Sequence, residues 1–269
     1  MEEKMAKNIA LQLYSVRDYA KEDFVKTLKK VADIGYKAVE PAGFWNLRPT
    51  EFKKIVNDLG MEICSSHSPW ASNPAILGEA MEIADAIGVK TIVCGYGPKD
   101  FEDMDAIKRT AENSRAMMEF LNRNGFSMMQ HNHYWEFTRL DGRLKYEIYR
   151  ELCPGMKYQI DCYWSSCNGT VDPCSVLKTF KDDIVSIHMK DGAYTSCKSC
   201  EMKNGYLDCK IDLLALGDGE LPITDLVPLI PERVPCLIVE LDYCNIEMFE
   251  ALQRSYDYLT RNNLAVGNK

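Results

Sequence analysis

No uninterrupted apolar run in the 269 residues reaches the roughly 18 residues that a membrane-spanning helix requires. The first residues, MEEKMAKNIA, also lack the apolar stretch of a secretory signal peptide. We therefore expect a cytoplasmic protein that has no membrane partner.

The chain has no excess of basic residues, because its net charge is −8. Nucleic-acid binders gain much of their affinity by neutralising phosphates with a basic face, so we expect no nucleic-acid partner. The glycine-rich motifs that bind dinucleotides or nucleotide phosphates are also absent after every predicted strand. Their absence disfavours a nucleotide-binding protein.

Cysteine, in contrast, is abundant, with 11 in the chain. Cys64, Cys94 and Cys236 lie within apolar strand-like runs, where we expect them to be reduced and buried. A polar loop carries three more: Cys197, Cys200 and Cys209. Their spacing is compatible with zinc binding or a redox pair, but a structural zinc site needs four ligands, and free loop thiols are the simpler interpretation.

Short β-rich runs alternate with longer helical stretches along the whole chain. Eight strands are predicted at 9–16, 37–43, 61–67, 90–97, 126–133, 157–164, 184–191 and 235–243. Helices are predicted at 23–35, 49–60, 75–88, 103–125, 144–152, 172–180, 222–230 and 247–259, and a long polar loop at 192–219. Strict alternation favours parallel strands with right-handed crossovers. We predict a single α/β domain over residues 1–269, a (β/α)₈ TIM barrel, with an open doubly wound sheet as the alternative.

Histidine is scarce, with only four in the chain, and all four fall where predicted strands end. The active site of a (β/α)₈ barrel lies at these carboxyl ends. The side chains predicted at this edge are Glu40, His67, His131, His133, Glu136, Asp161, His188, Lys190, Asp191, Glu240 and Asp242. Mixed histidine and carboxylate ligands suit Mn, Fe, Co, Zn or Mg. The pattern therefore indicates a metal-dependent active site.

Residues two apart on a strand share a face. His131 and His133 are thus expected to face the inside of the barrel together, with Asn132 turned away. By the same rule Lys190 shares a face with His188. Lys190 and Asp242 are predicted either to form a salt bridge behind the site or to contact the substrate.

Several segments carry a family resemblance over nearly the whole chain. They are LQLYSVRD at 11–18, GYKAVEPAGF at 35–44, HNHYWEF at 131–137, DCYW at 161–164, VDP at 171–173, IHMKDG at 187–192, LGDGELP at 216–222 and IVELD at 238–242. With these segments the chain resembles the sugar phosphate isomerase/epimerase family, the xylose isomerase-like barrels that are also grouped with AP endonuclease family 2.

The resemblance implies one divalent metal ion, with Asp161, His188 and Glu240 among its ligands. The family usually has a glutamate on the fifth strand, where this chain has His131, with Glu136 a short distance on. Either residue is the expected fourth ligand. The resemblance assigns catalytic roles to His133, Glu136 and Glu240. It assigns substrate contacts to Glu40, His67, Lys190 and Trp164, with Trp70 and Trp135 as further walls for a sugar.

For a metal site of this kind, the resemblance implies isomerisation or epimerisation of a sugar, keto-sugar or sugar phosphate. A base would remove a proton next to a carbonyl group, and the metal would stabilise the enediolate. The alternative is a lyase that eliminates a group from a 3-keto-sugar or keto-inositol with the same residues.

Two further classes compete with a sugar enzyme. An endonuclease acting on abasic DNA is disfavoured by the four histidines and the charge of −8. A non-catalytic barrel that binds a sugar or a partner is disfavoured because the chain retains the implied metal ligands Asp161, His188 and Glu240. The expected partner is a small-molecule carbohydrate, and pairing of barrels into a homo-oligomer is compatible with the resemblance.

Overall fold

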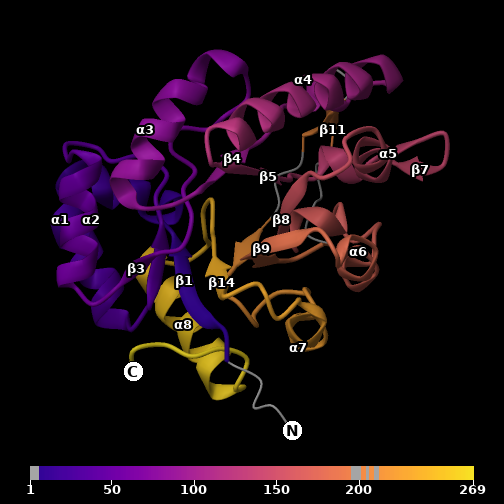
Figure 1. Cartoon of the computed structure of the whole chain (residues 1–269). Helices are drawn as coiled ribbons and strands as arrows, with labels where there is room; N and C mark the ends of the chain where they lie inside the picture. The colour runs from indigo at the N-terminus through magenta and orange to yellow at the C-terminus, as the bar shows by residue number, and fades with distance from the viewer. Residues whose placement is uncertain (1–5, 195–200, 204–205, 209–211) are drawn as a thin grey trace, which may run out of the picture.

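The computed structural model describes residues 6–194, 201–203, 206–208 and 212–269, and its eight parallel strands form a TIM barrel (Figure 1). The barrel strands are β1 (Asn8–Gln12), β2 (Ala38–Glu40), β3 (Glu62–Ile63), β4 (Thr91–Cys94), β5 (Ser127–His131), β8 (Lys157–Asp161), β9 (Ile184–Met189) and β14 (Cys236–Val239). Their order is β3-β2-β1-β14-β9-β8-β5-β4, so the first strand pairs with the last. Between β3 and β4 the ladder gives way to an extended segment, from which the Ala71 N–H donates to the Val93 carbonyl at 3.1 Å.

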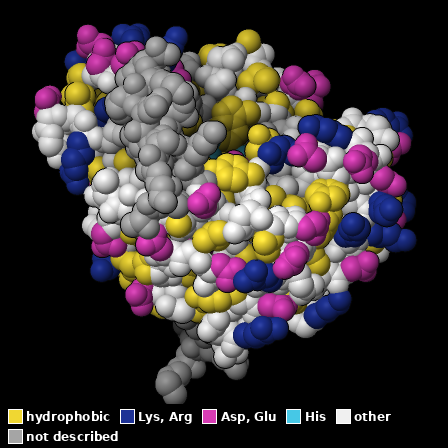
Figure 2. Space-filling view, turned by 180° about the vertical axis from the view of Figure 1, so that it is seen from behind, with side chains coloured by type: hydrophobic (Ala, Val, Ile, Leu, Met, Phe, Trp, Pro, Cys, Tyr) yellow, Lys and Arg dark blue, Asp and Glu magenta, His cyan; other side chains and the backbone are white. Residues whose placement is uncertain are grey.

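The helices lie outside the strands (Figure 1). They are α1 (Arg17–Ile34), α2 (Pro49–Asp58), α3 (Leu77–Ile87), α4 (Met104–Arg123), α5 (Lys145–Leu152), α6 (Pro173–Phe180), α7 (Ile223–Leu226) and α8 (Met248–Arg261). In the part of the chain that the structure describes, no helix combines the length and apolar character needed to cross a membrane. Acidic and basic side chains are interspersed over the face shown in Figure 2.

The first predicted strand and helix both differ from the structure at their shared boundary. Strand β1 ends at Gln12 instead of residue 16, because the Gln12 side chain accepts a hydrogen bond from the Tyr14 N–H at 3.0 Å and starts a 3₁₀ turn over Leu13–Val16. Helix α1 begins at Arg17 and is interrupted at Asp23, which has φ −156° and ψ 96°. The predicted start at residue 23 therefore marks its second segment.

Some short antiparallel pairs were not predicted. Strands β6 (Arg139–Leu140) and β7 (Arg143–Leu144) form a hairpin. Its two turn residues, Asp141 and Gly142, both have positive φ, as a type I′ turn requires. The predicted loop at 192–219 also contains strand structure. Its pairs are β10 (Asp191–Gly192) with β13 (Leu213–Leu214), and β11 (Glu201–Lys203) with β12 (Tyr206–Asp208).

The strand alternation separates two hydrophobic clusters. On β1, Ile9 and Leu11 belong to the large cluster, which also contains the buried faces of the helices. Ala10, between them, belongs to a small cluster with Ala38, Cys236 and Ile238. Because successive side chains of a strand point to opposite faces, the small cluster fills the inside of the barrel. Its small side chains fit the narrow interior of an eight-stranded barrel.

Cys94 and Cys236 lie in strands, Cys64 directly follows β3, and all three are free thiols, as predicted. Cys94 and Cys236 are buried, whereas Cys64 is half-buried and packs against the interior cluster. The loop cysteines Cys197 and Cys200, together with Cys209, lie outside the described residues.

Candidate functional site

The side chains inside the barrel change from small and apolar to polar toward the carboxyl ends of the strands. Two residues after Ala10 on β1 comes Gln12, and two residues after Ala38 on β2 comes Glu40. Gln12 and Glu40 are neighbours in the sheet register, and the Gln12 amide donates to a Glu40 carboxylate oxygen at 2.6 Å. Residues i and i+2 share a face, so these polar groups sit directly on top of the interior cluster.

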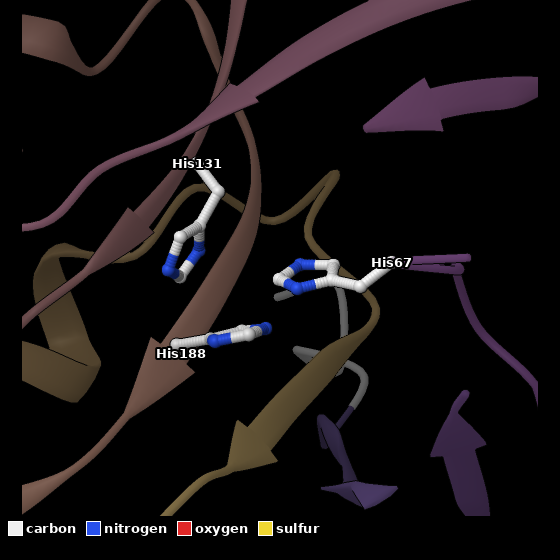
Figure 3. Close-up of side chains that lie close together, drawn as sticks. All are labelled: His67, His131 and His188. Atoms are coloured by element: carbon white, nitrogen blue, oxygen red, sulfur yellow. The ribbon is translucent and has the colours of Figure 1, made fainter. Parts of the chain in front are cut away.

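Three of the four histidines converge at this end of the barrel. His67, His131 and His188 point toward one another (Figure 3), and their ring centroids are 4.7 to 5.2 Å apart. Two carboxylates, Asp161 on β8 and Glu240 after β14, join them. One ligand atom from each of His131, Asp161, His188 and Glu240 lies within 4.8 Å of the others. The structure thus brings together the four residues that were predicted as metal ligands, with His131 rather than Glu136 among them.

This donor set fits a divalent cation. It offers two imidazole nitrogens and two carboxylates, the mixture that suits ions such as Zn, Mn or Fe. The Oδ2 atom of Asp161 is buried and accepts no hydrogen bond from any described residue, while Oδ1 accepts the N–H groups of Tyr163 and Trp164 at 3.0 and 2.8 Å. The carboxylate is therefore held in place through Oδ1, while Oδ2 lies 3.3 Å from Lys190 Nζ in an ion pair.

His188 is fully buried between two carboxylates. Its Nε2 lies 2.7 Å from Glu40 Oε1, and its Nδ1 lies 2.8 Å from Glu240 Oε2. Burial alone would lower the pKa of His188, but the two carboxylates outweigh it and raise the pKa to about 10. Burial likewise opposes ionisation of Glu40, yet His67 and His188 lower its pKa to about 2. Glu40 thus fixes the orientation of the His188 ring through the Nε2 atom of that ring.

Lys190 lies within a cage of three carboxylates. Its Nζ is 2.6 Å from Asp242, 3.2 Å from Glu240 and 3.3 Å from Asp161, and it lies 4.8 Å from the centroid of the Trp164 ring. Burial would lower the pKa of Lys190, but these carboxylates raise it above its usual range. Burial raises the pKa of Asp161 to about 6 against the opposing effect of Lys190. Glu240 has a pKa well below normal, because Lys190 and His188 outweigh its burial.

Sequence reasoning missed Gln159, which links the histidines to Glu40. Its Oε1 lies 2.6 Å from His67 Nε2 and 3.0 Å from His131 Nδ1, and its Nε2 donates to Glu40 at 2.7 Å. Gln159 is fully buried, two residues before Asp161 on β8. The shared face of residues i and i+2 was the available signal.

A pocket of about 660 Å³ opens above these groups. Among the predicted residues, His67, His131, His133, Glu240, Asp242, Trp70 and Trp135 line it. The predicted residues that are not among those lining the pocket are Glu40, Glu136, Asp161, His188, Lys190, Asp191 and Trp164. Tyr14, Tyr96 and Asp100, which sequence reasoning did not select, also line the pocket.

His133 and Glu136 occupy different positions relative to this pocket. His133 lines it, and its Nδ1 is buried without a hydrogen bond from the described residues. Burial, with Lys190 nearby, lowers the pKa of His133 to about 3, so the imidazole is neutral. Glu136 is fully buried behind it and accepts the His133 backbone N–H at 3.0 Å. Burial raises the pKa of Glu136 to about 8.

Two tryptophans form fixed walls of the pocket. The Trp70 indole N–H donates to the Gly95 carbonyl at 3.0 Å, and that of Trp135 donates to the Tyr96 carbonyl at 3.2 Å. Trp135 also stacks on His133, with centroids 4.3 Å apart and planes 15° apart. A Cβ atom on Gly95 would lie 1.7 Å from the Trp70 ring, so only glycine leaves room for this ring position.

A Gly95→Ala substitution is therefore expected to displace Trp70 and to lower the free energy of unfolding by about 1–3 kcal/mol, as in other overpacked sites. Urea unfolding measures the change, and tryptophan fluorescence reports the displaced ring. Gly97→Ala is the matched control, because a Cβ there would meet only Asp100 Oδ2, at 3.6 Å. Equal stability of the two variants would contradict the prediction.

Comparisons with known proteins agree with this architecture. A solved structure of a sugar phosphate isomerase/epimerase from Parabacteroides distasonis ATCC 8503 superimposes with a TM-score of 0.76 at 20% identity, covering 99% of this chain and 100% of that one. The probable 3-DHS dehydratase AsbF from Bacillus anthracis gives 0.68 at 12% identity, covering 94% and 98%. A D-allulose 3-epimerase from Methylomonas sp. gives 0.66 at 11% identity, covering 97% and 100%.

At these identities the structural likeness establishes the fold alone. No curated protein sequence matches the chain. A sequence profile described as "Xylose isomerase-like TIM barrel", however, matches residues 28–233, which is most of the chain. The chain therefore belongs to the family of xylose isomerase-like TIM barrels.

Proposed function

We propose that this chain is a metal-dependent isomerase or epimerase that moves a proton on a carbon next to the carbonyl group of a sugar or keto-sugar. The observation that carries the proposal is the convergence of His131, Asp161, His188 and Glu240 within 4.8 Å, beside a pocket walled by aromatic rings. A divalent ion held by these four residues would act as a Lewis acid, favouring loss of the proton by stabilising negative charge on the substrate oxygens.

Two side chains at the pocket suit the proton transfer. Glu240 is ionised, because Lys190 and His188 stabilise its carboxylate, and it is ready to accept a proton. His133 is neutral, and its Nδ1 is available for a second proton transfer. Glu136 acts through His133, since it holds the backbone of that residue.

The remaining predicted residues divide between substrate contact and positioning. His67, which lines the pocket and is fixed by Gln159, binds a substrate hydroxyl. Glu40 and Lys190 orient the imidazole and the carboxylates of the site, and Trp164 packs against the Lys190 ammonium. The rings of Trp70 and Trp135 contact the faces of the sugar.

The test is deuterium exchange. The purified protein is incubated with a panel of ketoses in D₂O, and the carbon next to the carbonyl is followed by NMR. We expect deuterium at that carbon, loss of exchange after treatment with a chelator, and its return when a divalent ion is added. If no ketose of a broad panel exchanges with metal present, the proposal is wrong.

A β-elimination on a 3-keto-sugar or keto-inositol is the second candidate, since one neighbour in fold is a probable dehydratase. The same residues would remove the proton, and a group at the β-carbon would then leave. Release of water or of an alcohol in the NMR experiment, instead of exchange alone, identifies this reaction.

A further inference from the structure

The pocket is larger than a single sugar ring. A hexose fills roughly 200 Å³, on the scale of about 30 Å³ for one water molecule, whereas the pocket has about 660 Å³. Ligand pockets usually bury most of the ligand surface. A monosaccharide held at His67 and Glu240 would leave the greater part of this pocket to solvent.

The pocket is walled by Trp70, Tyr96 and Trp135, and Tyr96 lies at its border with a second pocket. Backbone carbonyls hold both indole N–H groups, and Trp70 occupies the space left by Gly95. These rings are therefore in place before a ligand binds, so stacking on them costs little ordering of side chains. Such rigid aromatic faces suit the apolar face of a sugar ring.

This second pocket, of about 360 Å³, adjoins the first at Ser72, Tyr96 and Asp100, which line both. Most of its lining is polar, and it includes Lys99 before α4 and Arg109 and Asn113 on α4. The Asn113 amide reaches the Ser72 carbonyl at 3.4 Å, and Asp100 Oδ2 accepts the Gly97 N–H at 2.8 Å. Donors and acceptors of this kind suit the hydroxyl groups of a sugar better than an aromatic substituent.

We propose that the two adjoining pockets form an outer subsite for a second sugar ring, so that the substrate is a glycoside of two or more sugar units. The first ring lies over the strand-end residues, the glycosidic oxygen lies near the tryptophan walls, and the second ring extends toward Arg109 and Asn113. This inference rests on the proposed function for the identity of the first ring. In the elimination reaction the α-carbon would lose its proton to the base, a C=C bond would form to the β-carbon, and the glycosidic C–O bond would break, so that the second sugar leaves as an alcohol after taking up a proton.

The test is equilibrium binding, measured by tryptophan fluorescence and calorimetry on the full chain. The probes are glucose, the disaccharides cellobiose and maltose, and phenyl β-glucoside. We expect at least one disaccharide to bind about tenfold more tightly than glucose, the gain expected from one or two added hydrogen bonds. The double variant Arg109→Ala/Asn113→Ala should lose this advantage and keep the affinity for glucose.

Lys108→Ala is the matched control, since Lys108 is an exposed cation on the same helix and lies outside both described linings. The subsite is disproved if no disaccharide binds more tightly than glucose, or if the double variant keeps the advantage. Phenyl β-glucoside binding as tightly as the disaccharides would disprove the assignment to a sugar ring. Binding is measured without turnover. A failure of deuterium exchange would therefore overturn the proposed function but not the binding result, so the two failures can be told apart.

Discussion

Replacing Glu240 with glutamine is expected to slow proton exchange by about 10²- to 10⁴-fold, the usual contribution of a general base. The amide keeps the size of the side chain but does not accept a proton near neutral pH. Glu240 also lies 2.8 Å from His188 and 3.2 Å from Lys190, so the substitution removes a negative charge beside the Lys190 ammonium and one carboxylate of the proposed metal site. Binding of a divalent ion should weaken as well.

Exchange is therefore measured at saturating divalent ion, which separates loss of the base from loss of the metal. Asp242→Asn is the control, because Asp242 also lines the pocket and contacts Lys190, but its side chain is 31% exposed. Loss of the Asp242 carboxylate should slow proton exchange by less than about tenfold, because partly solvated ion pairs contribute little. Exchange by Glu240→Gln within tenfold of the unmodified protein would contradict the assignment and point to His133 as the base.

The convergence of the site could be predicted because strand ends meet at one edge of a barrel. His131, Asp161 and His188 each lie at or near the end of a strand whose apolar pattern is clear in the sequence. His131 and His133, two residues apart, both line the pocket, as their spacing predicts. The residue types also limited the chemistry, since two imidazoles and two carboxylates suit a divalent ion.

The supporting groups could not be predicted in the same way. Gln12 and Gln159 carry no charge and occur in apolar strands, so their types give no signal of a site. The i, i+2 rule places Gln159 on the same face as Asp161, but only the register shows that Gln12 lies beside Glu40 and Gln159 beside His131. The position of Glu136 could not be predicted for a different reason. It follows strand β5 in the 3₁₀ turn Trp135–Phe137, where the alternation of strand faces no longer applies.

The other variant with a large expected effect is Glu136→Gln, which should make the folded protein more stable at pH 8. Glu136 is fully buried, its Oε1 accepts no hydrogen bond from the described residues, and burial raises its pKa to about 8. In the unfolded chain the carboxyl ionises near its ordinary pKa of 4.5. Because the folded pKa is the higher one, the contribution of this group to stability is complete below pH 4.5 and is lost as the pH rises to 8.

At about 1.4 kcal/mol for each pKa unit, this loss amounts to a few kcal/mol, on the order of 4 at most. Glutamine does not titrate, so the variant should match the unmodified protein near pH 4.5 and exceed its free energy of unfolding at pH 8. Urea unfolding across this range gives the difference, with Glu112→Gln on the exposed face of α4 as the control. A constant difference at all pH values would contradict the raised pKa.

The same variant separates two roles of Glu136 in the proposed reaction. If Glu136 acts only by holding the backbone of His133, the amide oxygen of glutamine can still accept that N–H, and deuterium exchange should persist. If Glu136 itself exchanged protons with the substrate, exchange should fall as far as in Glu240→Gln, because the carboxyl is gone in both. Its position behind His133, outside the described lining of the pocket, favours the first result.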